Sequence, residues 1–379
     1  MGITITKIIF RELAIPFVRT FKHSSAERAE TQTVWIELHT QCGLVGFGEG
    51  CPRPYVTSES TITAIQFFNN YKDTVKENIH SFQELKRWVA ANQGTIDKNP
   101  AAWCAFELAI LDVLAKSQKK SVEELLCLSK LVGGFQYSAI LGDSSTKSFQ
   151  KLLSQYYSQG FRDYKIKLSG DLQHDKQKFE QFSLLNDSDI EVRVDANNLW
   201  DNAKEAVTYI QNLEIPIWAI EEPLIGNNYM ELSRIAKLLD CYIILDESFL
   251  RFEHFSQLES LSSKWIINLR ISKMGGLIRS IEIASHASKI GIPLIVGAQV
   301  GETSLLTRTA LTINNHFTNN ILKREGGFGT LLLKQDVCDP PLMMNLKGVL
   351  TYSATPDTID GFSVDVDLES INPWLKELN

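Results

Sequence analysis

The sequence is poor in cysteine and has no long apolar run, and these absences exclude several classes of protein. Its six cysteines are widely spaced over 379 residues, with no Cys-x-x-Cys pair, so we expect no disulfide framework and a location in the reducing cytoplasm. Apolar and polar residues alternate through residues 1–17, and a charge appears by Arg11, which predicts an opening strand rather than a signal peptide or a membrane span.

The sequence also lacks an excess of positive charge. It has 38 lysines and arginines against 45 aspartates and glutamates, a net charge of −7, and no basic stripe, so we expect neither a nucleic-acid nor a membrane partner. Hydrophobic residues make up 44% and charged residues 22%, a mixture typical of folded, soluble proteins. Gly-x-Ser-x-Gly, His-Glu-x-x-His and P-loop motifs are absent, so nothing indicates serine or zinc hydrolysis or a phosphate-binding loop.

Two kinds of pattern divide the chain. Period-two alternation through residue 50, followed by helical periodicity over residues 57–129, predicts an N-terminal α+β domain over residues 1–132. From residue 133 onward, short apolar strands alternate with amphipathic helices, which predicts parallel βαβ units over residues 133–345. The expected strands are 138–141, 164–168, 191–195, 217–221, 242–246, 265–271 and 293–296.

A regular repeat connects these strands. One chemically unusual residue stands near the end of six of them: Lys167, Asp195, Glu221, Asp246, Arg270 and Gly297. Their separations are 28, 26, 25, 24 and 27 residues, which predicts a (β/α) barrel with its functional groups at the C-terminal strand ends. A doubly wound sheet is the alternative, but no Gly-x-Gly-x-x-Gly turn follows any of these strands.

Three of these residues are acids in series. Asp195, Glu221 and Asp246 close consecutive strands, and neighbouring parallel strands lie roughly 5 Å apart, so the three side chains are expected to converge. Their mutual repulsion predicts a hard divalent cation with oxygen ligands, and Mg²⁺ is the commonest choice, with Mn²⁺ as a substitute. A single acid after a strand is usually a turn residue or a helix cap, but three at a constant period favour the metal site.

Two lysines precede the acids in the same barrel. Lys165 and Lys167 are two residues apart in one strand, so both point to the same side. A second ammonium group and a nearby metal both disfavour protonation of Lys167, as a general base requires. The alternative is an edge strand with a solvated lysine face. A base opposite a metal indicates removal of the proton next to the carboxylate of a small-molecule substrate, with an enolate as the developing species.

Further motifs extend this pattern along nearly the whole chain. They are Gly46-Phe-Gly-Glu-Gly50, Ala105 to Lys116, Val194-Asp-Ala-Asn197, Ile220-Glu-Glu-Pro223, Asp246-Glu-Ser248 and Ser272-Lys-Met-Gly-Gly276. Together with Lys165-Ile-Lys167 they resemble the enolase superfamily, in the mandelate racemase and muconate lactonizing enzyme family. The resemblance is to the muconate cycloisomerase-like branch, which includes cycloisomerases, o-succinylbenzoate synthases, N-acylamino acid racemases and dipeptide epimerases.

The resemblance carries expectations for fold and site. It implies a modified (β/α)7β barrel of the TIM type, an N-terminal α+β capping domain, and a tail over residues 346–379 that returns to the cap. It also implies that Mg²⁺ is bound by Asp195, Glu221 and Asp246, and that Lys167 is an acid/base assisted by Lys165. We further expect a homo-oligomer, because that is usual for such enzymes.

Arg270 departs from the pattern of the racemising members, which carry a lysine at this position. Arginine is effectively always protonated and is a poor proton shuttle, although it can hold a carboxylate or an enolate by its charge. We therefore expect a one-base isomerase or lyase of the cycloisomerase or syn-dehydratase type. Two alternatives stay open: a racemase or epimerase of amino acid derivatives or dipeptides, and a barrel that binds metal and ligand without turnover.

A second departure concerns the substrate. Dipeptide epimerases carry an Asp-x-Asp pair where this chain reads Lys323-Arg324-Glu325, which weakens a dipeptide assignment. A substrate with a second anionic group beside Arg270 and Arg324 is expected, unless Arg324 is a solvated loop residue. Residues 17–25 are expected to form either a mobile loop over the pocket or an ordinary hairpin. Further candidates for supporting or substrate contacts are Asn197, Glu247, Lys273, Glu302, Arg19 and His23.

Overall fold

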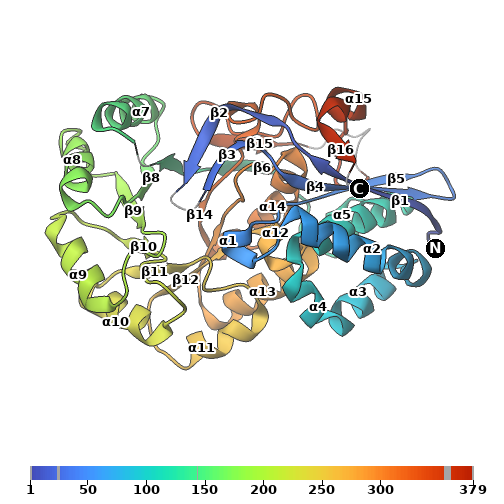
Figure 1. The fold of residues 1–379 in the computed structure, drawn as a ribbon, viewed down its shortest axis with the longest axis horizontal. Helices are drawn as coiled ribbons and strands as arrows, with labels where there is room; N and C mark the ends of the chain where they lie inside the picture. The colour runs from blue at the N-terminus through green and yellow to red at the C-terminus, as the bar shows by residue number, and fades with distance from the viewer. Residues whose placement is uncertain (1, 24–25, 143, 354–359, 378–379) are drawn as a thin grey trace.

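The computed structural model describes residues 2–23, 26–142, 144–353 and 360–377, and Figure 1 shows its fold. Its N-terminal α+β domain contains a four-stranded antiparallel sheet in the order β16-β1-β4-β5. Leu375 of β16 pairs with Leu13 of β1, so the C-terminal segment ends in the N-terminal sheet. The strands of this domain are β1 (Ile5–Leu13), β4 (Thr33–Thr40), β5 (Val45–Gly50) and β16 (Leu375–Glu377), with a separate hairpin of β2 (Pro16–His23) and β3 (Ala26–Glu30).

A long buried helix packs across this sheet, and glycines of β5 allow the contact. Gly46, Gly48 and Gly50 occupy alternate positions of the strand, so they face the same side. A Cβ atom on Gly48 would lie only 1.8 Å from the carbonyl oxygen of Ala105, so the close approach of helix α5 requires glycine. The helices of the domain are α1 (Pro54–Thr57), α2 (Thr61–Asn78), α3 (Phe82–Ala91), α4 (Gln93–Lys98), α5 (Pro100–Ser117) and α6 (Val122–Leu125).

The remainder of the chain forms a curled parallel sheet of eight strands surrounded by helices, as the 26-residue repeat predicts (Figure 1). The strand order β14-β13-β12-β11-β10-β9-β8-β7 follows the sequence. The strands are β7 (Ala139–Leu141), β8 (Asp163–Lys167), β9 (Glu191–Asp195), β10 (Ala219–Glu221), β11 (Tyr242–Leu245), β12 (Trp265–Leu269), β13 (Leu294–Val296) and β14 (Ile321–Arg324). The prediction of a barrel with an α+β cap is therefore confirmed, and β14 is a strand that the sequence analysis did not identify.

A seam separates the two edges of the curled sheet. Strands β7 and β14 stand at opposite ends of the strand order, and the backbone N–H of Ser138 donates to the carbonyl of Arg324 at 2.9 Å across the seam. Strand β6 (Gly133–Gln136), which precedes β7, pairs antiparallel with β15 (Val349–Tyr352), which follows β14. The outer helices are α7 (Thr146–Ser158), α8 (Leu172–Ser183), α9 (Ala203–Asn212), α10 (Tyr229–Leu239), α11 (Phe255–Glu259), α12 (Ile271–Met274), α13 (Leu277–Ile290) and α14 (Ser304–His316), and α15 (Leu368–Ile371) lies in the C-terminal segment.

Two further expectations concern the environment of the protein. No helix in the described part of the chain is long and apolar enough to cross a membrane. All six cysteines lie among the described residues as free thiols, four of them buried and two exposed. The absence of a disulfide agrees with the wide cysteine spacing in the sequence.

Candidate active site

The carboxyl ends of neighbouring strands bring the predicted reactive residues to one end of the sheet. The ladder between β8 and β9 pairs Lys167 with Asp195, and the ladder between β9 and β10 pairs Asp195 with Glu221. Asp246 directly follows β11, and Arg270 directly follows β12. Except for Glu221, these residues line a cavity of about 630 Å³. The strand ends therefore form the floor of this cavity, as the repeat predicts.

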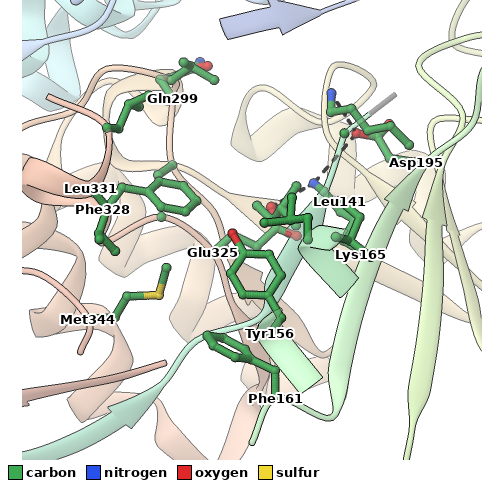
Figure 2. Close-up of a pocket in the computed structure, with 18 of the residues that line it drawn as sticks. Leu141, Tyr156, Phe161, Lys165, Asp195, Gln299, Glu325, Phe328, Leu331 and Met344 are labelled. Carbon is green, nitrogen blue, oxygen red and sulfur yellow. Dashed lines mark hydrogen bonds and ion pairs between the residues drawn. The ribbon is translucent and has the colours of Figure 1, made fainter. Parts of the chain in front are cut away.

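Lys165 is a buried cation at the centre of this floor. Its Nζ lies 2.8 Å from Glu221 Oε2. It also lies 2.8 Å from Glu325 Oε2 and 3.8 Å from Asp195 Oδ2, and Figure 2 shows Lys165 between these two acids. Burial alone would lower the pKa of Lys165, but these carboxylates outweigh burial and raise it. Lys165 is therefore held in its protonated form and acts as a fixed positive charge.

Lys167 is placed differently from its neighbour two residues earlier. Its side chain is 12% exposed, against 4% for Lys165, and it lines the cavity. Its Nζ lies 3.4 Å from Asp195 Oδ2 and donates to Asn197 Oδ1 at 3.1 Å. The Asn197 amide nitrogen in turn donates to Asp195 Oδ1 at 2.6 Å. Asn197 thus orients both the lysine and the carboxylate.

The other two predicted metal ligands are also hydrogen bonded within the protein. Glu221 Oε1 accepts from Asn268 Nδ2 at 2.9 Å, and burial raises the pKa of Glu221 to about 7. Asp246 Oδ1 accepts from Lys273 Nζ at 2.8 Å. Lys273 is buried and also donates to the backbone carbonyl of Asn268 at 2.6 Å, so it fixes the end of β11 against the end of β12.

Arg270 lies among these acids. Its guanidinium contacts Asp246 Oδ2, lies 3.7 Å from Glu221 Oε1, and donates from Nη1 to Gln299 Oε1 at 3.2 Å. Burial alone would lower the pKa of Arg270, but Asp246 and Glu221 outweigh burial and raise it further above its ordinary value. A permanently charged guanidinium can hold an anion but cannot exchange a proton with it.

The donor set can be tested for its fit to Mg²⁺. Among the described residues, no three histidine, cysteine or acidic side chains already stand as a cluster of metal ligands, because the acids turn toward cationic side chains. The chemistry nevertheless fits, since Asp195, Glu221 and Asp246 are buried oxygen donors at neighbouring strand ends. Burial raises the pKa of Glu247 beside them, and its Oε2 has no hydrogen-bond partner among the described residues. In the structure the acids are paired with Lys165, Lys167, Arg270 and Lys273, so an ion bound by Asp195, Glu221 and Asp246 would compete with these cationic side chains.

Other predicted residues lie at greater distance from the reaction centre. Glu302 Oε1 accepts from the backbone N–H of Gln299 at 2.6 Å, and burial raises the pKa of Glu302 to about 7, but Glu302 is not part of the cavity lining. Arg324 lies over the ring of Phe135 at 5.7 Å and does not line the cavity either. The backbone of Arg19 and His23 belongs to β2, but their side chains lie outside the described part of the structure.

Sequence reasoning missed two buried charged residues that contact the site. Glu325 bonds both Lys165, at 2.8 Å, and Arg193 Nη2, at 2.9 Å, and Arg193 is fully buried. Glu325 stands 28 residues after Gly297, so one further step of the repeat points to it. Arg193 stands two residues before Asp195 in the same strand, so the rule that aligned Lys165 with Lys167 also finds Arg193.

Comparisons with known proteins agree with this architecture. The family described as "Mandelate racemase / muconate lactonizing enzyme, N-terminal domain" matches residues 5–127, and the family described as "Enolase C-terminal domain-like" matches residues 148–370. The N-succinyl-L-Arg/Lys racemase of Bacillus cereus is 23% identical, covering 96% of this chain and 99% of the relative. Muconate cycloisomerase 1 of Acinetobacter baylyi is 26% identical, covering 94% of this chain and 95% of the relative.

Solved structures show the same fold. The crystal structure of the Bacillus cereus racemase superposes with a TM-score of 0.85 at 21% identity, covering 99% of this chain and 98% of the other. A dipeptide epimerase from Enterococcus faecalis, crystallised with Mg and the dipeptide L-Leu-L-Tyr, superposes with a TM-score of 0.81 at 21% identity, covering 95% and 99%. Both chains match this one over nearly their full lengths.

Proposed function

Because this chain belongs to the mandelate racemase and muconate lactonizing enzyme family of the enolase superfamily, we propose that it is a Mg²⁺-dependent isomerase or lyase. Its reaction begins with removal of the proton α to the carboxylate of a small-molecule substrate. The observation that supports this most is the pairing of a cavity-facing lysine, Lys167, with three carboxylates at neighbouring strand ends. A base and a set of oxygen donors thus face the same space.

In this proposal the carboxylates and the two lysines have separate roles. Asp195, Glu221 and Asp246 would hold Mg²⁺, or Mn²⁺ in its place, and the bound ion supplies positive charge beside the substrate carboxylate. Lys167 Nζ takes the α-proton and holds it, oriented by its hydrogen bond to Asn197 Oδ1. Lys165 stays charged beneath it, held by its ion pairs with Glu221 and Glu325.

Arg270 limits the stereochemistry of the reaction. It extends from β12, whereas Lys167 ends β8, so the two side chains approach the cavity from different strands. Asp246 and Glu221 keep the guanidinium protonated, so Arg270 anchors negative charge and carries no proton to the substrate. The proton then returns to the face it left, or a leaving group departs from that face. Cycloisomerisation, syn elimination and exchange with retention all satisfy this requirement.

A racemase or epimerase is the second candidate, and the names of the similar proteins favour it. That reaction needs a proton carrier on each face of the α-carbon. Among the described residues that line the cavity, Lys165 and Lys167 are the lysines, and both belong to β8. The racemase assignment therefore needs a proton carrier other than lysine on the far side.

The test is deuterium exchange at the α-carbon. N-acyl amino acids, dipeptides, muconates and cyclohexadiene carboxylates are incubated with the enzyme in D₂O, with Mg²⁺ or with a chelator, and the α-proton is followed by NMR. We expect Mg²⁺-dependent exchange or product formation in at least one class. Lys167→Met should lower the rate by on the order of 10² to 10⁴, whereas Lys151→Met, at an exposed site on α7, should leave it unchanged. Equal exchange by Lys167→Met would contradict the proposal, and binding without exchange would favour a barrel without turnover.

A further inference from the structure

The cavity above the strand ends has a second region whose chemistry differs from that of the reaction centre. Charged residues of the described lining gather at the strand ends. The rest of the lining is mainly apolar, with Ser144, Gln155, Gln159 and Asn345 among its polar members. Its apolar side chains include Ile140 and Leu141 of β7; Phe149, Leu152 and Tyr156 of α7; Phe161 between α7 and β8; Phe328, Leu331 and Leu332 after β14; and Met344 and Leu346.

The seam between β7 and β14 connects the two regions. Figure 2 shows Lys165 and Asp195 on one side of the cavity, with Tyr156 and Phe161 below Glu325, and Phe328, Leu331 and Met344 on the other side. The backbone hydrogen bond from Ser138 to Arg324 bridges the seam, and the segments that follow these two residues, 140–142 and 325–326, line the cavity. The apolar region and the reaction centre therefore belong to the same cavity.

Gly142 directly follows β7. It lines the cavity, and a Cβ atom built on it would meet nothing within 4 Å, with a backbone conformation that other residues can adopt. A side chain at this position would therefore stand in open space beside the cavity without strain in the backbone.

Exposed apolar side chains form the rim of the same cavity. Val18 is 57% exposed, Leu331 43% and Leu346 65%, and all three line the cavity although they come from distant segments. Single exposed apolar residues are common, but a group around one cavity is typical of a binding site. On helix α7, Phe149, Leu152 and Tyr156 follow helical spacing and so present one apolar face to this space.

We propose that this apolar region binds the substrate, and that the substrate is a carboxylic acid joined to an uncharged apolar group the size of an aromatic ring or a short alkyl chain. This inference rests on the proposed function for the position of the carboxylate at the strand ends. A volume of about 630 Å³ lies in the range of sites for extended organic ligands. It also replaces the expectation of a second anionic group, because Arg324 does not line the cavity.

The first experiment compares four ligands by isothermal titration calorimetry of the full-length protein with Mg²⁺. N-hexanoyl-L-alanine and its isomer N-acetyl-L-2-aminoheptanoate place the same apolar carbons on the nitrogen or on the α-carbon. N-acetyl-L-alanine lacks them, and N-succinyl-L-alanine carries an anionic tail instead. At least one long isomer should bind about tenfold or more tightly than N-acetyl-L-alanine, because the added methylene groups leave water. The succinyl compound should gain nothing.

The second experiment locates the effect with matched variants. Gly142→Leu should remove the preference for the long isomer over N-acetyl-L-alanine. Gly94→Leu is the control, because Gly94 also has open space around it and lies on the exposed surface of α4. Leu346→Glu should likewise remove the preference, against Leu184→Glu at another exposed leucine, so the test does not depend on one variant that folds.

These outcomes separate the two proposals. Equal affinities for the long and short ligands, a preference for the succinyl compound, or a preference unchanged in both Gly142→Leu and Leu346→Glu would each overturn the apolar region as the substrate site. Tight binding of a long isomer without α-proton exchange in D₂O would leave the apolar site standing and count against the proposed reaction. Equally efficient α-proton exchange with long and short ligands would support the proposed reaction and count against the apolar region as the substrate site.

Discussion

The mouth of the barrel and its interface with the N-terminal domain both bury carboxylates, but they compensate them in opposite ways. At the mouth, Glu325 lies 2.8 Å from Lys165 and 2.9 Å from Arg193. At the interface, Glu49 of β5 accepts from the hydroxyl of Thr303 at 2.6 Å and from its backbone N–H at 3.1 Å. One acid is bonded to two cations and the other to neutral donors.

The consequences for charge follow directly. Burial alone would raise the pKa of Glu325, but Lys165 and Arg193 outweigh burial and lower it to about 2. Burial raises the pKa of Glu49 to about 8, because the hydrogen bonds from Thr303 only partly oppose it. Glu107 of α5 behaves like Glu49: it accepts from the backbone N–H of Ile278 at 2.9 Å, and burial raises its pKa to about 7.

The difference separates two uses of a buried acid. Acids at the interface tie the cap to the barrel through hydrogen bonds, as Glu49 does to Thr303 and Glu107 does to Ile278. Such a tie works with a protonated carboxyl as well as with a carboxylate. At the mouth, the two cations beside Glu325 keep its negative charge in place although it is buried, whereas burial still raises the pKa of the nearby Glu221 to about 7. That arrangement suits a centre where a metal and a substrate anion bind.

Removing Lys165, the cation at the centre of the barrel mouth, should change the stability of the protein most. Lys165→Met leaves Glu221 and Glu325 buried without it, so we expect a loss of about 3 to 5 kcal/mol in the free energy of unfolding. Lys264→Met is the control, because Lys264 forms an equally short ion pair with Asp240, 2.7 Å, on the surface. Lys264→Met should leave the midpoint of chemical denaturation nearly unchanged, because the pair is exposed to solvent. Equal losses of stability in Lys165→Met and Lys264→Met would show that burial does not make the ion pairs of Lys165 more important than the surface pair.

A smaller effect is expected from the metal. Mg²⁺ at about 100 times its dissociation constant should stabilise the native protein by about 2.7 kcal/mol, because it binds only the folded state. Asp246→Asn should remove most of that stabilisation in a thermal melt, because it removes one of the proposed ligands. Asp240→Asn, outside the cavity, should keep it. A full Mg²⁺ shift in a protein with both Asp195 and Asp246 replaced by asparagine would exclude the site.

The smallest expected effect is a slope in the pH dependence of stability. Because the folded pKa of Glu49 is raised from 4.5 to about 8, the folded state holds this proton more tightly than the unfolded state. Its contribution to stability is present below about pH 4.5 and is lost as the pH rises toward 8. Glu49→Gln should therefore flatten the fall in stability over this range.

Glu84, a partly buried acid whose pKa is shifted in the opposite direction, serves as the control for this slope. Hydrogen bonds from the backbone of His80 and from the Ser81 side chain lower the pKa of Glu84. Its contribution is present above the unfolded pKa of 4.5 and lost only as the pH falls through its lowered folded value. Glu84→Gln should leave the slope between pH 4.5 and 8 unchanged. An unchanged slope in Glu49→Gln would contradict the role assigned to the buried carboxyl.

The sequence predicted those parts of the site that follow strand periodicity. Lys167, Asp195, Glu221, Asp246 and Arg270 all stand at strand ends, because the period of a βαβ unit is a local property. The last strand was missed because β14 is only four residues long and ends in two charged residues, a pattern typical of an exposed segment. Glu325, which follows this strand, was missed for the same reason.

The apolar region of the cavity could not be predicted in the same way. Leu152 of α7, Phe328 after β14 and Leu346 each read as ordinary residues of their own segment. They meet only because the sheet leaves a seam between its first and last strands, which is a property of the tertiary fold. The contact of Arg270 with Asp246 is likewise set by packing across strands rather than by spacing.

The central claim, that Lys167 removes and returns a proton on one face while Arg270 carries none, is tested most directly by the fate of one enantiomer. A single enantiomer of a substrate that undergoes exchange is incubated with Mg²⁺ in D₂O, and the product is examined by NMR for deuterium and by chiral chromatography for configuration. The account predicts α-deuteration with retention, or a cyclised or dehydrated product, without the mirror image. Formation of both enantiomers at a rate comparable to exchange would contradict it and assign the second proton transfer to Arg270 or to another group.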